Sequence, residues 1–177
     1  MCMKNKYIVL DRDGTLIKHF PYLKDIELVQ ILPYVVDGLK LLRNLGYSFG
    51  IISNQSVIGR GQASEVTVSA INNKISEMLG NYGLEIKFIY FCPHSPDDNC
   101  LCRKPLPKLG IEAIHSFGID TESSFYIGDS ALDMEFGKNI GLKTIKLPGV
   151  LSYNGPMDTY ANHLLDAALI IQNRFHK

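Results

Sequence analysis

The stretch Tyr7-Ile8-Val9-Leu10-Asp11-Arg12-Asp13-Gly14-Thr15 places two carboxylates directly after four apolar residues. A short continuous apolar run is typical of a buried parallel strand. Two carboxylates at the end of such a strand are costly unless a cation lies between them, and Mg²⁺ needs only one or two protein carboxylates. A carboxylate can also attack phosphorus as a nucleophile. Taken alone, however, the motif fits an Asp-rich turn better. Further motifs elsewhere in the chain are needed to favour a catalytic site.

Short apolar runs alternate with helical patterns along the rest of the chain. Besides residues 7–10, the predicted strands are 47–52, 86–91, 125–127 and 143–147. The predicted helices are 33–46, 64–79, 107–117, 130–140 and 161–175. This alternation predicts one α/β domain, residues 1–177, built on a doubly wound parallel sheet. In such sheets the ligand lies beyond the carboxyl ends of the strands, which is where chemistry is expected.

Three further polar motifs lie at or near these positions. Ser53-Asn54-Gln55 follows the second strand and can hold phosphoryl oxygens without adding charge, or can cap a helix. Arg103-Lys104-Pro105 brings a lysine that can neutralise a nucleophile and a phosphate. Gly128-Asp129-Ser130 follows the fourth strand and offers a second magnesium carboxylate, while Asp133, one helical turn later, can orient its neighbours. Each motif alone could be a cap or a solvated turn, but the set in this order indicates phosphoryl transfer.

The four motifs together resemble the haloacid dehalogenase (HAD) superfamily of phosphatases over roughly residues 6–150. The resemblance implies a Rossmann-like core and a magnesium-dependent phosphatase. Asp11 would attack phosphorus, and Asp13 would protonate the leaving oxygen and then activate water. Magnesium would be held by Asp11, the backbone carbonyl of Asp13, and Asp129. The resemblance also implies three ligands for the phosphoryl oxygens: Ser53, Asn54 and Lys104.

A second metal site is predicted in the loop 92–102, which precedes the Lys104 motif. Cys92, His94, Cys100 and Cys102 offer three thiolates and one imidazole, the ligand set of a closed structural zinc site. Bound zinc would stiffen this loop and aim Arg103 and Lys104 at the phosphate. The alternative is a proline-rich loop with reduced thiols. The fourth cysteine, Cys2, is expected to be a free thiol.

The loops also bear on the substrate. The spacing between the motifs leaves no room for an inserted cap domain, so specificity should come from residues 17–30, 56–62 and the metal loop. The metal loop resembles two small zinc-bearing groups, the D-glycero-D-manno-heptose 1,7-bisphosphate 7-phosphatases and the histidinol-phosphatase domains. Arg60 in Ser56-Val57-Ile58-Gly59-Arg60-Gly61 favours the heptose group. Arg60 and Arg103 could together bind the second phosphate of a bisphosphate.

Composition limits the other possibilities. Among 177 residues, 18 Lys+Arg balance 18 Asp+Glu, so no bulk field attracts nucleic acid or an anionic membrane. The sequence shows no signal peptide or membrane-length apolar run, which predicts a cytoplasmic protein, taken as a monomer, acting on a small phosphorylated metabolite. A zinc-bearing binding module without catalysis is a rival, but the intact acidic motifs argue against it. Four histidines, His19, His115, His163 and His176, are interpreted as surface or packing residues.

Overall fold

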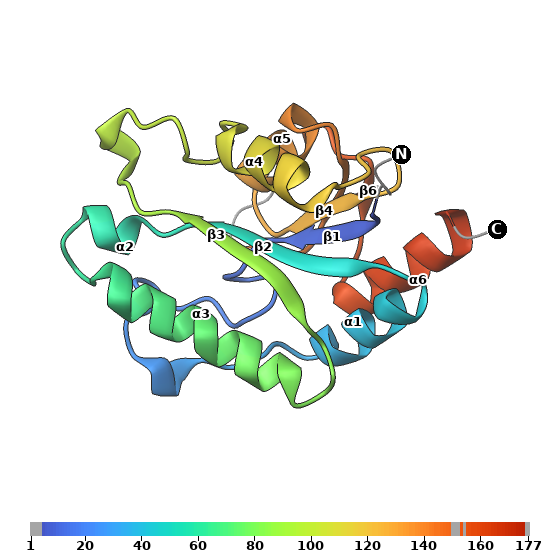
Figure 1. Cartoon of the computed structure of the whole chain (residues 1–177), viewed down its shortest axis with the longest axis horizontal. Helices are drawn as coiled ribbons and strands as arrows, with labels where there is room; N and C mark the ends of the chain where they lie inside the picture. Colours follow the sequence, from blue (N-terminus) through green and yellow to red (C-terminus); the bar gives the residue numbers. More distant parts are fainter. Residues whose placement is uncertain (1–4, 150–152, 154, 176–177) are drawn as a thin grey trace.

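Six parallel strands form one sheet in the computed structural model, which describes residues 5–149, 153 and 155–175 (Figure 1). Cys2 and His176 lie outside these residues. The strands are β1 (Tyr7–Leu10), β2 (Ser48–Asn54), β3 (Ile86–Cys92), β4 (Phe125–Gly128), β5 (Lys143–Lys146) and β6 (Thr159–Tyr160). Their order is β3-β2-β1-β4-β5-β6. The five predicted strands are confirmed. The sixth was missed because two residues are too short to show a hydrophobic pattern.

Helices connect the strands, and each predicted helix is present with ends within three residues of those expected. The α-helices are α1 (Val35–Asn44), α2 (Ser56–Gly59), α3 (Glu65–Gly80), α4 (Lys108–Phe117), α5 (Ala131–Asn139) and α6 (Leu164–Phe175). Two 3-10 turns, η1 (Ile26–Leu28) and η2 (Pro96–Asp98), and the one-turn α2 lie in segments that were expected to be loops. A single turn carries no helical periodicity, so the sequence gives no signal for it.

Alternate side chains of β1 enter two different cores. Ile8 and Leu10 point into the larger core, which is completed by α1, α3 and α6. Tyr7 and Val9 point to the other face, where α4 and α5 supply the covering residues. The sheet is therefore covered on both faces (Figure 1), as its continuous apolar strands predict. No helix among the described residues is both long and apolar enough to cross a membrane.

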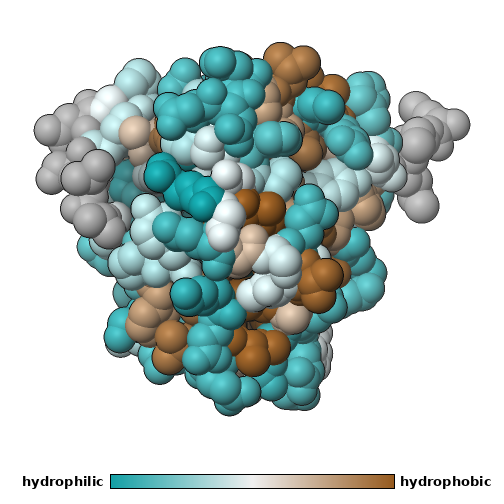
Figure 2. Space-filling view, turned by 90° about the vertical axis from the view of Figure 1, so that its left-hand side faces the viewer, coloured by the Kyte–Doolittle hydropathy of each residue, from teal (hydrophilic) through white to brown (hydrophobic). Residues whose placement is uncertain are grey.

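The strand order fixes where a ligand can bind. From β1 the chain builds outward to β3 on one side, and then returns to build β4, β5 and β6 on the other. The carboxyl ends of β1 and β4 therefore form a topological switch point, where parallel sheets open a crevice. The backbone N–H of Asp11 donates to the carbonyl of Ile127 at 3.0 Å, which holds these two strand ends together. Figure 2 views the molecule from this edge, where hydrophilic surface surrounds separate hydrophobic patches.

Candidate active site

The ammonium group of Lys104 is the centre of the charged cluster at the switch point. Its Nζ lies 2.6 Å from Oδ1 of Asp11 and 2.6 Å from Oδ1 of Asp133, and its side chain is 3% exposed. It also donates to the carbonyl of Ile52 at 2.9 Å and lies 2.8 Å from the hydroxyl of Tyr126. The fold thus brings Asp11 and Lys104 into contact although they are 93 positions apart in the chain. Tyr126 was missed because a tyrosine inside a buried strand is otherwise typical of packing.

Asp129 completes an acidic cluster with Asp11 and Asp133. One carboxylate oxygen from each of the three lies within 4.8 Å of the others, close enough to hold a metal ion. Gly14 makes this approach possible. Its φ is +82°, and a Cβ there would lie 2.2 Å from Oδ2 of Asp129. Only glycine therefore lets the loop after β1 come this close to the end of β4.

The cluster carries more negative charge than Lys104 can balance. The pKa of Asp11 is raised to about 8, mainly by burial, with Lys104 opposing the increase and the charges of Asp133 and Asp13 adding to it. Burial, followed by the charge of Asp133, raises the pKa of Asp129 to about 6. Ionised carboxylates packed in this way need a further cation. The donor set consists of hard oxygens, which suits a divalent cation such as Mg²⁺.

Asp13 is held by a separate buried network. Its Oδ2 accepts hydrogen bonds from Nε of Arg12 at 2.9 Å and from Nε2 of Gln55 at 3.0 Å. Its Oδ1 accepts a hydrogen bond from Nη2 of Arg12 at 3.2 Å. No function was predicted for Arg12 or Gln55 from the sequence. The sequence signal that could have pointed to Arg12 is its place between two aspartates, directly after an apolar strand.

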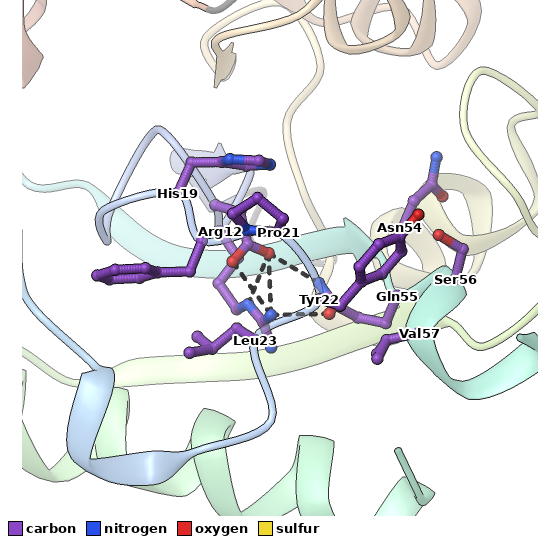
Figure 3. A pocket seen from close by; sticks show the side chains of 11 residues that line it. Arg12, His19, Pro21, Tyr22, Leu23, Asn54, Gln55, Ser56 and Val57 are labelled. Atoms are coloured by element: carbon purple, nitrogen blue, oxygen red, sulfur yellow. Dashed lines mark hydrogen bonds and ion pairs between the residues drawn. The ribbon is translucent and has the colours of Figure 1, made fainter. Parts of the chain in front are cut away.

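The cleft above these groups has two lobes, of about 340 and 430 Å³. Asp13, His19 and Asn54 line both lobes and mark their junction. The first lobe, shown in Figure 3, runs between the loop that carries His19 and the end of β2. The second contains Asp11, Lys104 and Asp129. His19 is exposed, as expected for a surface residue, and it also lies in the wall of the cleft, which the sequence did not indicate.

The predicted phosphate ligands are placed in different ways. Ser53 is buried, and its hydroxyl accepts a hydrogen bond from Nε2 of Gln55 at 3.1 Å. The side chain of Asn54 holds the backbone of Lys104, since its Nδ2 donates to the carbonyl at 3.1 Å and its Oδ1 accepts from the N–H at 2.9 Å. Asn54 therefore fixes the position of Lys104, which the prediction of a direct phosphate ligand did not anticipate.

The two arginines expected to bind a second phosphate are not brought together in the cleft walls. Arg103 lines the second lobe, and its Nη1 donates to the carbonyl of His94 at 3.2 Å. Arg60 is exposed at the end of α2 and lines neither lobe. Its guanidinium lies over the ring of Tyr22, 5.9 Å from the centroid, and Tyr22 lines the first lobe. A site that pairs the two arginines therefore stays a prediction, because it would require the side chain of Arg60 to turn toward the cleft.

The cysteine loop brings its four predicted ligands together. Sγ of Cys102 lies 3.2 Å from Sγ of Cys92 and 3.8 Å from Sγ of Cys100, while Cys92 and Cys100 are 3.6 Å apart. Nδ1 of His94 lies 3.3 Å from Cys102 and 3.6 Å from Cys92. The three cysteines are free thiols. All four ligand atoms lie within 4.8 Å of one another, as in a closed tetrahedral site, although the 3.2 and 3.3 Å contacts of Cys102 are somewhat shorter than the roughly 3.5–3.8 Å between the ligands of a bound zinc ion.

Comparisons with known proteins agree with this geometry. A family model described as polynucleotide kinase 3 phosphatase matches residues 6–147. A D-glycero-beta-D-manno-heptose-1,7-bisphosphate 7-phosphatase from Yersinia pestis is 32% identical over 180 residues, which cover 95% of this chain and 96% of the relative. The corresponding alpha-D-manno enzyme from Photorhabdus laumondii is 36% identical over 146 residues, which cover 78% and 80% of the two chains. A crystal structure of D,D-heptose 1,7-bisphosphate phosphatase from B. bronchiseptica, complexed with magnesium and phosphate, has a TM-score of 0.83 at 26% identity and covers 95% of this chain and 98% of that one.

The fold and the site, with these relatives, define a phosphatase of the haloacid dehalogenase superfamily. The sequence resemblance is thereby confirmed, and the rival of a non-catalytic binding module is set aside. Within the superfamily, the chain belongs to the family of D-glycero-D-manno-heptose-1,7-bisphosphate 7-phosphatases. The relatives support this prediction over the histidinol-phosphatase alternative.

Proposed function

We propose that this enzyme removes the 7-phosphate of D-glycero-D-manno-heptose 1,7-bisphosphate through an aspartyl-phosphate on Asp11. The observation that carries the proposal is the contact between Asp11 and Lys104 at the switch point, with Asp129 beside them, in a chain 32% identical to a named heptose bisphosphatase along nearly its whole length. The relatives include enzymes named for both the alpha and the beta anomer, so the proposal covers either anomer.

The roles of the residues follow from their positions. An oxygen of Asp11 attacks phosphorus while Asp13, at the junction of the lobes, gives a proton to the departing sugar oxygen. Asp13 then takes a proton from the water that releases phosphate and restores Asp11. Lys104 and the hydroxyl of Ser53 bind the phosphoryl oxygens. Bound Mg²⁺, held by Asp11, Asp129 and the backbone carbonyl of Asp13, would neutralise the charge that develops on phosphate.

Arg103 is the guanidinium that we assign to the distal phosphate of the substrate, because it lines the lobe that holds Asp11 and Lys104. A guanidinium fork can bind two phosphate oxygens at once. Arg60 is a second candidate for binding this phosphate, because it contacts Tyr22 in the wall of the first lobe. To bind there, the side chain of Arg60 would have to turn toward that lobe. Histidinol phosphate has no second phosphate and would leave Arg103 without this partner.

The experiment that tests this function measures phosphate release in the presence of Mg²⁺. It compares kcat/KM for the heptose 1,7-bisphosphate, the heptose 7-phosphate and histidinol phosphate. We expect the bisphosphate to be the best substrate, because only it can bind at both Asp11 and Arg103. Equal values for all three would remove the proposed specificity and leave a general sugar phosphatase. A preference for histidinol phosphate would overturn the assignment to the heptose group.

We predict that the stability of the metal-free protein falls as pH rises. Asp11 and Asp129 have folded-state pKa values of about 8 and about 6, both above the ordinary value of 3.8. A raised folded-state pKa favours folding below the unfolded pKa, and this contribution is lost as pH rises through the folded value. The free energy of unfolding, measured without metal, should therefore decrease from about pH 4 to pH 8.

Magnesium should reverse this trend. A ligand that binds only the folded state at 100 times its Kd adds about 2.7 kcal/mol of stability. Because Mg²⁺ binds ionised carboxylates, the gain should be larger at pH 8 than at pH 5. Urea unfolding at both pH values, with and without Mg²⁺, gives the comparison. Equal gains at both values would argue against a site made of Asp11 and Asp129.

We propose that the Cys92, His94, Cys100 and Cys102 tetrad binds one structural zinc ion, and we predict its effect on stability. Elemental analysis should find one zinc per chain, and Cys102→Ser should lose it. Losing about 2 kcal/mol in this way would lower Tm by ~4–8 °C. The matched control is Cys2→Ser, which changes the cysteine outside the tetrad and should keep the zinc. Purified protein that folds normally with no zinc would refute the assignment.

A further inference from the structure

Arg12 is a fully buried guanidinium whose contacts come from three separate parts of the chain. Its side chain is 1% exposed, although arginine is normally one of the most solvated residues. It pairs with Asp13 in its own loop, donates from Nη2 to Oε1 of Gln55 at 2.7 Å, and donates from Nη1 to Oδ1 of Asn72 at 3.0 Å. Asn72 lies on α3 and is itself 4% exposed.

Such burial is costly unless the charge is neutralised and the N–H groups are hydrogen-bonded. Asp13 supplies the charge, and the two amides supply neutral acceptors. Asn72 stands 60 residues from Arg12 in the sequence and occupies a core position of α3 between Ile71 and Ile75, where an apolar side chain would otherwise pack. The buried side chain of Asn72 is explained by its hydrogen bond to Arg12, because buried polar groups need such a partner.

The network also distinguishes the two oxygens of Asp13. Oδ2 accepts two hydrogen bonds, one from Arg12 and one from Gln55, at 2.9 and 3.0 Å. The contact of Oδ1 with Nη2 of Arg12 is longer, at 3.2 Å, and this Nη2 also donates to Gln55 at 2.7 Å. Oδ1 therefore keeps the greater capacity to carry and transfer a proton. The fork of Arg12 sets the plane of the Asp13 carboxylate, and Figure 3 shows Arg12 beside Gln55. Asn72 on α3 supplies the other acceptor that orients this guanidinium.

We propose that Arg12, Asn72 and Gln55 are positioning residues that aim Oδ1 of Asp13 at the leaving oxygen. This inference rests on the proposed role of Asp13 as the acid. In the step concerned, the bond from Asp11 to phosphorus forms, the bond from phosphorus to the sugar oxygen breaks, and the proton on Oδ1 moves to that oxygen. Displacing Asp13 therefore slows the departure of a basic alkoxide, but has little effect on a leaving group that departs well without a proton.

The test uses Asn72→Ala in the full-length, metal-loaded enzyme with two substrates. One is the heptose bisphosphate, whose alkoxide leaving group needs a proton. The other is p-nitrophenyl phosphate, whose phenolate leaving group does not. We expect the ratio of kcat for the sugar phosphate to kcat for the aryl phosphate to fall about 10-fold or more. The matched control is Asn73→Ala, the same substitution at the exposed neighbouring position, which should leave the ratio unchanged.

Two further variants separate the role of the positioning network from the role of Asp13 itself. Gln55→Met removes the second support with little change in size and should lower the same ratio. Asp13→Asn should lower it most, by ~10²–10⁴-fold, if Asp13 is the acid. A normal ratio in Asp13→Asn would overturn the proposed role of Asp13. A large drop in Asp13→Asn with a normal ratio in both Asn72→Ala and Gln55→Met would overturn only the positioning network. An equal loss on both substrates in Asn72→Ala would show a merely structural role and reject the inference.

Discussion

Replacing Asp11 with asparagine is expected to reduce phosphate release by on the order of 10⁴-fold or more, because the amide cannot form the phosphoryl intermediate. The fold should survive the change. Burial already raises the pKa of Asp11, so its ionised form is disfavoured in the folded protein. The amide has nearly the same shape, and Lys104 keeps its ion pair with Asp133. Steady-state kinetics with the heptose bisphosphate, together with Tm, separates loss of chemistry from loss of structure.

The matched control is Asp37→Asn, the same substitution at an exposed position of α1. Its activity should equal that of the wild type. Phosphate release by Asp11→Asn at an undiminished rate would rule out the aspartyl-phosphate mechanism, whatever the substrate. A large loss accompanied by unfolding would instead contradict the expectation that the neutral side chain is tolerated at this position.

Lys104→Met is expected to have the largest effect on stability. The ammonium lies 2.6 Å from both Asp11 and Asp133, and removing it leaves two buried carboxylates without their counter-charge. Breaking a buried ion pair in this way costs about 3–5 kcal/mol, which for a chain of this length lowers Tm by ~6–20 °C. Activity should fall as well, by ~10²–10³-fold, because a charge on the phosphoryl oxygens is lost.

Lowering the pH should recover part of that stability, since protonating Asp11 removes one of the unbalanced charges. Lys108→Met serves as the control, because Lys108 is exposed at the start of α4. The measurement is the Tm of both variants at pH 5 and pH 8, and we expect the loss of Tm in Lys104→Met to be smaller at pH 5. A Tm for Lys104→Met within about 2 °C of the wild type at pH 8 would show that the buried cluster does not depend on this ammonium.

The order of strands and helices could be read from the sequence because buried parallel strands and amphipathic helices leave periodic apolar patterns. The same sheet explains why the motifs around Asp11, Asn54, Lys104 and Asp129 could be expected to meet. Each follows a strand end or lies in a loop at the same edge. The tetrad of three cysteines and His94 was predictable for a different reason, since all four of its ligands are confined to eleven residues.

The sequence could not predict contacts made by residues that also fit their own strand or helix as ordinary packing residues. Tyr126 and Asn72 fit a strand and a helix as packing residues, and only the fold brings them to Lys104 and Arg12. His19 lies in a loop without periodicity, so its place in the cleft wall depends on how that loop folds. Asn54 was expected at the phosphate, but its amide matches the backbone of Lys104, a pairing that exists only after folding.

The most direct test of the proposed reaction is ³¹P NMR of D-glycero-D-manno-heptose 1,7-bisphosphate during turnover with Mg²⁺. The proposed function predicts that the signal of the 7-phosphate disappears, while inorganic phosphate and the heptose 1-phosphate accumulate in equal amounts. Loss of the 1-phosphate signal first, or loss of both phosphates at similar rates, would contradict the assignment of Asp11 to the 7-phosphate and of Arg103 to the distal one.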